Sequence, residues 1–212
     1  MGIGNCFSGL IQGIEYYRKN PSQEVTGIIH DKLSGYGIHD IDFVCGFDVG
    51  ENKVGKLLHE AIYEYPNMVD WIAKDDLPKN EAMIYESPIL DGVGIWVENK
   101  IKPIVSTKTT EQIAEEVKQV IKDKGVEIIV SYLPVGSDKV TEFWAQICLD
   151  TKTAFVNCIP SFIASDEKWA KKFEDANVPC IGDDIKGQVG ATIVHRTLAK
   201  LCSDRGTKIE KT

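Results

Sequence analysis

Residues 126–159 read VEIIVSYLPVGSDKVTEFWAQICLDTKTAFVNCI, and this stretch decides the fold class. Its first part, Val126 to Leu133, is almost continuously apolar, as in a parallel strand that is buried on both faces. The part from Ser137 to Asp150 predicts a helix, and Ala154 to Ile159 is a second apolar run. Strand, helix and strand in this order form the unit of a parallel sheet that is covered by helices on both faces.

The same alternation continues on both sides of this stretch. Apolar residues at helical or continuous spacing mark each further element. Strands are expected at residues 41–48, near Ile84, and at 126–133, 154–159 and 178–181. Helices are expected at residues 8–19, 51–63, 109–122, 137–150, 166–176 and 188–202. The sequence therefore predicts one α/β domain over residues 1–204, followed by a polar tail at 205–212.

Three regions carry more specific expectations. Residues 24–40, rich in Gly and His, predict a loop or a small excursion. Trp71 is the expected apolar anchor of the irregular stretch 66–94. The last helix is expected to pack through one apolar face, formed by Ile193, Val194, Leu198 and Leu201.

Composition excludes several classes of protein. The chain has 212 residues, and 24 Lys and Arg against 32 Asp and Glu give a formal net charge of −8. Such a chain lacks the positive face that sequence-independent binding to nucleic acid needs. No apolar run approaches the roughly 18 residues of a membrane span. No secretory signal precedes the fold, so the six scattered cysteines predict buried free thiols in the cytoplasm, and no metal site is expected.

The chain begins with a glycine turn, Gly2-Ile3-Gly4-Asn5-Cys6, which leads directly into a helix. Such a turn lets backbone N–H groups approach a pyrophosphate at the positive end of the helix. The usual fingerprint has a third small residue, where this chain has Phe7, and follows a strand, where this chain has only Met1. An ordinary turn at the start of a chain is the alternative.

Asp48 ends the strand predicted at residues 41–48. An acid in this place can accept hydrogen bonds from the adenosine ribose, which favours NAD over NADP. A solvated acid in a strand-to-helix turn is the alternative. With the glycine turn, Asp48 indicates a Rossmann-like, doubly wound parallel sheet that lacks its first strand.

Three further segments follow strands and therefore lie where ligands bind in open α/β sheets. Ser131 to Ser137 and Asn157 to Ser161 contain Pro or Gly and suit close approach to a flat ligand, although simple tight connections have the same composition. Asp183, Asp184 and Lys186 follow the last strand. These charged residues can serve as a proton relay or charge partner, or they can cap the next helix.

Taken together, several segments resemble the prokaryotic type of myo-inositol-1-phosphate synthase, also called inositol-3-phosphate synthase. The segments are GNC at 4–6, IDFVCGFDVGENKVGK at 41–56, SYLPVGSD at 131–138, FVNCIPSFIASDEKWAKKFEDANVPCIGDDIK at 155–186 and QVGATIVHRTLA at 188–199.

The resemblance implies an isomerase that converts glucose 6-phosphate to inositol phosphate with a recycled NAD, which first oxidises the substrate and then reduces the ring-closed product. It implies that Gly2, Gly4, Asn5 and Cys6 hold the pyrophosphate and that Asp48 holds the ribose. Ser131, Tyr132, Leu133, Pro134, Cys158 and Ile159 would line the dinucleotide. Asp183, Asp184 and Lys186 would approach the nicotinamide and the substrate. Intact members of the family are expected to be homotetramers.

Two departures from the family set the remaining expectations. Family members have an apolar strand before the glycine turn, and this strand would lie between those ending at Asp48 and Leu133. They also continue past the helix that ends near Cys202, into the region that covers the substrate, forms the tetramer and supplies the lysines of the active site. The 212 residues are therefore expected to be a fragment without activity of its own. A non-catalytic NAD-binding module and an NAD-dependent dehydrogenase are the alternatives.

Overall fold

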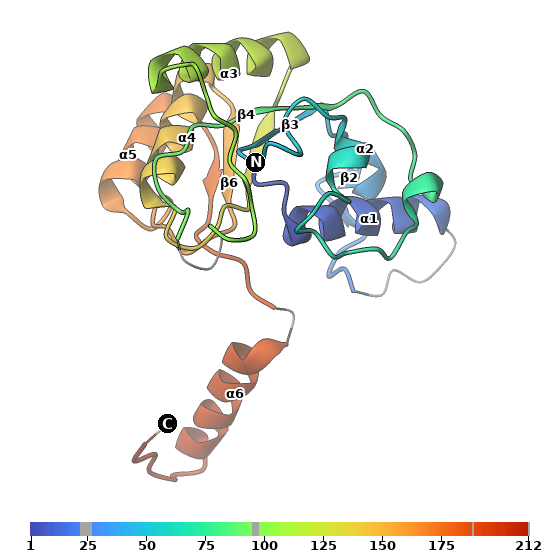
Figure 1. Ribbon diagram of the computed structural model, residues 1–212. Coiled ribbons are helices and arrows are strands. Elements are labelled where there is room, and N and C mark those ends of the chain that lie inside the picture. Colours follow the sequence, from blue (N-terminus) through green and yellow to red (C-terminus); the bar gives the residue numbers. More distant parts are fainter. Residues whose placement is uncertain (22–26, 95–97, 188, 212) are drawn as a thin grey trace.

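The structure is a computed structural model, and it describes residues 1–21, 27–94, 98–187 and 189–211 (Figure 1). Helices are α1 (Asn5–Lys19), α2 (Leu58–Ala61), α3 (Thr110–Lys124), α4 (Asp138–Thr151), α5 (Glu167–Ala176) and α6 (Gly190–Asp204). Short 3-10 turns occupy Ile38–Asp40 and Lys74–Asp76. Strands are β1 (Lys32–Leu33), β2 (Tyr36–Gly37), β3 (Cys45–Asp48), β4 (Met83–Glu86), β5 (Ile128–Ser131), β6 (Ala154–Asn157) and β7 (Cys180–Ile181).

Strands β3 to β7 form two parallel sheets, one of β3 and β4 and one in the order β5-β6-β7, and β1 and β2 form a separate antiparallel pair. Helices α3, α4 and α5 lie on one side of these strands, and α1 and α2 lie on the other (Figure 1). This is the predicted Rossmann-like α/β arrangement with parallel sheets.

Residues 1 and 2 lie between the two sheets. The Met1 amine donates to the Val130 carbonyl at 2.6 Å, and the Met1 carbonyl accepts from the Tyr132 N–H at 3.0 Å. On the other side, the Gly2 N–H donates to the Phe47 carbonyl at 2.9 Å. The resemblance implied a family strand between those ending at Asp48 and Leu133, which this chain was expected to lack, and Met1 and Gly2 occupy this place.

Each face of the sheets has its own apolar core. On one face, Trp144 and Phe155 are fully buried and pack with residues of α3 and α5. On the other face, Ile3 and Leu58 are fully buried and pack with residues of α1 and β4. Ile3 belongs to the glycine turn, so the second core holds that turn in place.

The prediction of a helix over 51–63 is wrong for most of its length, since the helix is confined to Leu58–Ala61. Gly55 has a φ of +84°, which no α-helix contains. Its N–H donates to the Ile84 carbonyl, and the Lys56 carbonyl accepts from the Ile84 N–H. Pairing with β4 therefore replaces the helical hydrogen bonds there.

Two smaller expectations are also corrected, and a third is made more specific. Trp71 is 75% exposed, whereas Leu77 and Ile84 are buried and anchor that stretch. Within the predicted loop 24–40, the described residues 27–40 contain the β1–β2 hairpin, and 24–26 lie outside the described residues. All six cysteines are free, but only Cys148 and Cys158 are buried, and Cys6 is exposed.

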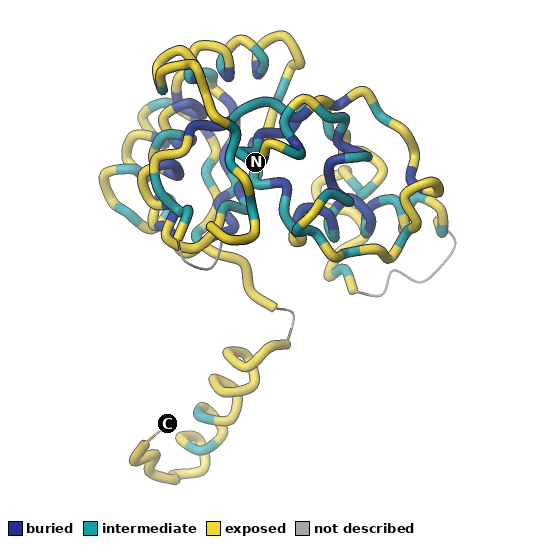
Figure 2. The backbone as a smooth tube through the Cα atoms, in the orientation of Figure 1, coloured by how far each residue is buried: buried dark blue, intermediate teal, exposed yellow. Residues whose placement is uncertain are grey.

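Helix α6 lies apart from the rest of the domain (Figure 1), and its residues are largely exposed (Figure 2). Its predicted start at Gln188 lies outside the described residues. The apolar face expected to pack is exposed in this structure, at Ile193, Val194, Leu198 and Leu201.

Candidate functional site

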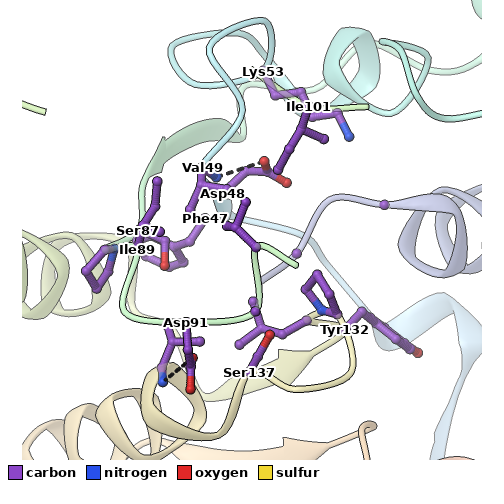
Figure 3. Close-up of a pocket in the computed structure, with 18 of the residues that line it drawn as sticks. Phe47, Asp48, Val49, Lys53, Ser87, Ile89, Asp91, Ile101, Tyr132 and Ser137 are labelled. Atoms are coloured by element: carbon purple, nitrogen blue, oxygen red, sulfur yellow. Dashed lines mark hydrogen bonds between the residues drawn. The ribbon is translucent and has the colours of Figure 1, made fainter. Parts of the chain in front are cut away.

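A pocket opens where β3, β4 and β5 end, and it encloses about 880 Å³ including the part open to solvent (Figure 3). Its walls come from the glycine turn, the segments that follow these strands, and the first turn of α4. It brings together seven of the predicted residues, Gly2, Gly4, Asn5, Asp48, Tyr132, Leu133 and Pro134. The other predicted residues do not line it, namely Cys6, Ser131, Cys158, Ile159, Asp183, Asp184 and Lys186.

The two glycines of the turn have different environments. Gly2 has a φ of +72°, and a Cβ there would lie 2.6 Å from the Tyr132 carbonyl oxygen. A Cβ on Gly4 would meet nothing within 4 Å. Gly2 is therefore required for the backbone to pass β5, whereas Gly4 leaves the backbone open toward the pocket.

Gly4 is also the N-cap of α1, and among the described residues no side chain caps this helix. The first N–H groups of a helix have no partner inside it and carry a partial positive charge. An uncapped helix of 15 residues at an open glycine has the chemistry of an anion site, and a pyrophosphate fits it.

Asp48 connects the glycine turn to the end of β3. Its Oδ2 accepts from the Ile3 N–H at 2.7 Å, and its Oδ1 accepts from the N–H groups of Val49 and Gly50, both at 2.8 Å. A carboxylate has about four acceptor positions, so capacity for one further donor remains. This capacity fits a ribose hydroxyl at the pocket.

Sequence reasoning missed Lys53, whose side chain lies across the pocket wall and is buried. Its Nζ donates to the Ile3 carbonyl at 2.7 Å and to Asn67 Oδ1 at 3.0 Å. Asn67 Nδ2 donates to the same Ile3 carbonyl at 2.9 Å. Burial lowers the pKa of Lys53, and the charges of Asp48 and Glu64 oppose this effect. Gly50 and Gly55 on either side were the available signal for a turn that points this lysine inward.

Sequence reasoning also missed the segment 87–93, which crosses the pocket to the N-terminus of α4 (Figure 3). The Asp91 carboxylate accepts from the N–H groups of Lys139 and Val140, at 2.7 and 3.2 Å. Gly92 has a φ of +78°, and a Cβ there would lie 2.1 Å from Ser137 Oγ. This segment therefore caps α4 with a carboxylate from 48 residues earlier in the chain.

Tyr132 and Cys158 form a pair beside the pocket. Burial, together with the nearby Cys158 thiol, raises the pKa of Tyr132. Cys6, in the first turn of α1, is exposed. Cys158 thus lies next to Tyr132, which lines the pocket, but Cys158 does not line the pocket.

The three predicted catalytic residues lie on the loop after β7. Asp183 accepts from Asn157 Nδ2 at 2.8 Å and from the backbone N–H groups of residues 163–165 at 3.0–3.1 Å. Burial raises the pKa of this carboxyl, but the hydrogen bonds from Asn157 and the backbone outweigh it, so the pKa is lowered. Asp183 therefore holds two strand-end loops together as an ionised acceptor, while Asp184 and Lys186 are exposed.

Two further searches cover the described part of the chain. No group of three or more His, Cys, Asp or Glu side chains that could hold a metal ion occurs there. Among these residues, no helix has the length and apolar character needed to cross a membrane.

The fold and the pocket define a Rossmann-like α/β protein whose open helix N-terminus faces a cleft at the strand ends. Comparison with known proteins is consistent with this class. No family model matches the chain. Inositol-3-phosphate synthase of Mycolicibacterium smegmatis is 45% identical over 213 residues, which cover 100% of this chain and 56% of that protein.

Two solved structures have folds similar to that of this chain. The crystal structure of Ari2 is similar with a TM-score of 0.80 and 30% identity, covering 97% of this chain and 59% of that one. A myo-inositol-1-phosphate synthase-related protein from Thermotoga maritima has the same fold, with a TM-score of 0.74 and 20% identity over 97% of this chain and 58% of that one.

The resemblance to inositol-3-phosphate synthases is therefore confirmed along the whole of this chain. The chain spans 56% of the length of the curated relatives it matches.

Proposed function

We propose that this chain binds NAD in the pocket and serves the isomerisation of glucose 6-phosphate to 1D-myo-inositol 3-phosphate. The observation that carries the proposal is the 45% identity to an inositol-3-phosphate synthase over the full chain. The site adds independent support, because an uncapped helix, an open glycine and an acid with spare acceptor capacity suit a dinucleotide.

Each part of the chain has a role in this proposal. Backbone groups of Gly2, Gly4, Asn5 and Cys6 bind the pyrophosphate, and Asp48 binds the adenosine ribose. Tyr132, Leu133 and Pro134 line the pocket and form the wall along the dinucleotide, and the buried residues Ser131, Cys158 and Ile159, which do not line the pocket, lie behind this wall. NAD, when bound, supplies a hydride acceptor that is regenerated within the same reaction.

The loop after β7 is the proposed approach to the substrate. Lys186 and Asp184 are exposed on this loop and are available to a phosphorylated sugar. Asp183 acts as a positioning residue, because its carboxylate is held by Asn157 and by three backbone N–H groups. The proposal assigns catalysis to the intact enzyme, as a homotetramer.

Titration calorimetry with NAD and NADP tests the cofactor. We expect NAD to bind at least roughly tenfold more tightly than NADP, because a 2′-phosphate beside the Asp48 carboxylate is repelled. The variant Asp48→Asn should reduce this preference. Tighter binding of NADP than of NAD by the unmodified chain would contradict the ribose role of Asp48.

A further inference from the structure

The Lys53 ammonium is buried without a direct counter-ion. The residue is 4% exposed, and its two hydrogen-bond partners, the Ile3 carbonyl and the Asn67 amide oxygen, are neutral. No carboxylate of the described residues forms a salt bridge with it. A buried charge is unfavourable unless it is paired. The folded chain thus holds a buried positive charge that no carboxylate of the described residues contacts directly, although the charges of Asp48 and Glu64 act on it from nearby.

The geometry of the ammonium leaves one donor for a ligand. An ammonium has three N–H groups, and two of them are directed to Ile3 and Asn67. Lys53 lines the pocket, so the third can face it. Figure 3 shows Lys53 at the same wall as Asp48.

Positive side-chain charge in the described pocket wall is confined to one point. The charged residues that line it in the described part of the chain are Asp48, Asp91 and Lys53. Lys53 is thus the lone cation beside two carboxylates, and it is bonded to the carbonyl of the residue directly before Gly4. The uncapped N-terminus of α1 begins at Gly4, so the helix and the ammonium can act on the same anion.

We propose that Lys53 binds the pyrophosphate of the dinucleotide through its third N–H group, while its other two hold the glycine turn in position. This inference rests on the proposed NAD function. The burial-lowered pKa of Lys53 agrees with it, since an incoming pyrophosphate would restore the balance of charge around the ammonium.

The test measures binding of ADP-ribose and adenosine to the unmodified chain and to Lys53→Met. ADP-ribose contains the pyrophosphate, and adenosine does not. We expect Lys53→Met to raise the Kd of ADP-ribose roughly ten- to hundredfold and that of adenosine less than about threefold. The matched control is Lys56→Met, which removes a lysine whose partly exposed side chain pairs with Glu64 and does not line the pocket.

A purely structural role predicts a different result. If Lys53 only held the turn, adenosine and ADP-ribose would lose affinity equally, and that result would overturn the proposal. Asn67 still holds the Ile3 carbonyl in the variant. If Lys53→Met does not fold, Lys53→Gln retains a donor for Ile3 and removes the charge, so the same comparison is made with it.

Inorganic pyrophosphate separates this inference from the proposed function. If the unmodified chain does not bind NAD, the proposed function fails. Pyrophosphate then still decides the role of Lys53 as an anion ligand. Binding that is lost in Lys53→Met supports it, and equal binding, or no binding, by both proteins overturns it.

Discussion

Two helix N-termini face the same pocket, and they differ in what fills them. That of α1 begins at Gly4 with no side-chain cap and open space above it. That of α4 is filled by the Asp91 carboxylate, which accepts from two of its backbone N–H groups. An N-terminus that already has a carboxylate has little affinity left for a phosphate. The difference leaves the first N–H groups of α1 available to a ligand, whereas those of α4 are bound by the chain's own carboxylate.

The largest effect is expected at the turn before α1. Gly2→Ala places a Cβ 2.6 Å from the Tyr132 carbonyl oxygen at a φ of +72°. We expect a loss of about 2–4 kcal/mol in the free energy of unfolding, from backbone strain and displacement of β5. Urea denaturation followed by circular dichroism measures it.

Gly4→Ala is the matched control for that substitution, because its Cβ meets nothing within 4 Å. It should lower stability by less than about 1 kcal/mol while weakening the binding of NAD. Equal stability losses in the two variants would contradict the different roles given to Gly2, which lets the backbone pass close to β5, and Gly4, which leaves the backbone open to the pocket.

A smaller effect is expected at α4. Asp91→Ala removes the carboxylate that caps the helix, and loss of a cap lowers stability by about 0.5–2 kcal/mol. The variant should then resemble α1 in having a free N-terminus, so phosphate ions should raise its Tm more than they raise that of the unmodified chain. Thermal unfolding at several phosphate concentrations checks this. An equal increase of Tm with phosphate in both proteins would show that Asp91 does not keep phosphate from the N-terminus of α4.

The smallest effect is expected at Ser137, beside the same cap. Its hydroxyl is buried and has no hydrogen-bond partner among the described residues. Ser137→Ala should therefore change the free energy of unfolding by less than about 0.5 kcal/mol, and an increase in stability is the expected direction. A loss above about 1 kcal/mol, measured by urea denaturation, would mean that the hydroxyl contributes to capping α4 after all.

Local patterns were sufficient for most of the fold. Apolar runs predicted β5 and β6, and helical spacing predicted α3, α4 and α5, because these elements bury continuous or periodic surfaces. The glycine turn and Asp48 were found because they follow known local arrangements. The prediction failed over 51–63, where the pairing of Lys56 with Ile84 depends on a segment 28 residues away. A helical pattern does not contain that information.

The missed parts of the site share the same cause. Lys53 reaches Ile3 across 50 residues of sequence, and Asp91 reaches Lys139 across 48. Neither residue stands in a motif, and each acquires its role from a backbone group that folding brings near. The unpacked face of α6 shows the converse, since periodicity predicts an apolar face but does not specify what it contacts.

Residues 1 and 2 join the two sheets, and Gly2, Gly4 and Asn5 form one wall of the pocket. The same short segment of backbone thus connects the two sheets and lines the pocket. A molecule bound to the glycine turn would therefore also stabilise the contact between the two sheets. Hydrogen exchange of the backbone amides in β3 and β5 should then become slower when the ligand is bound. The same measurement would report both ligand binding and the stability of the contact between the two sheets.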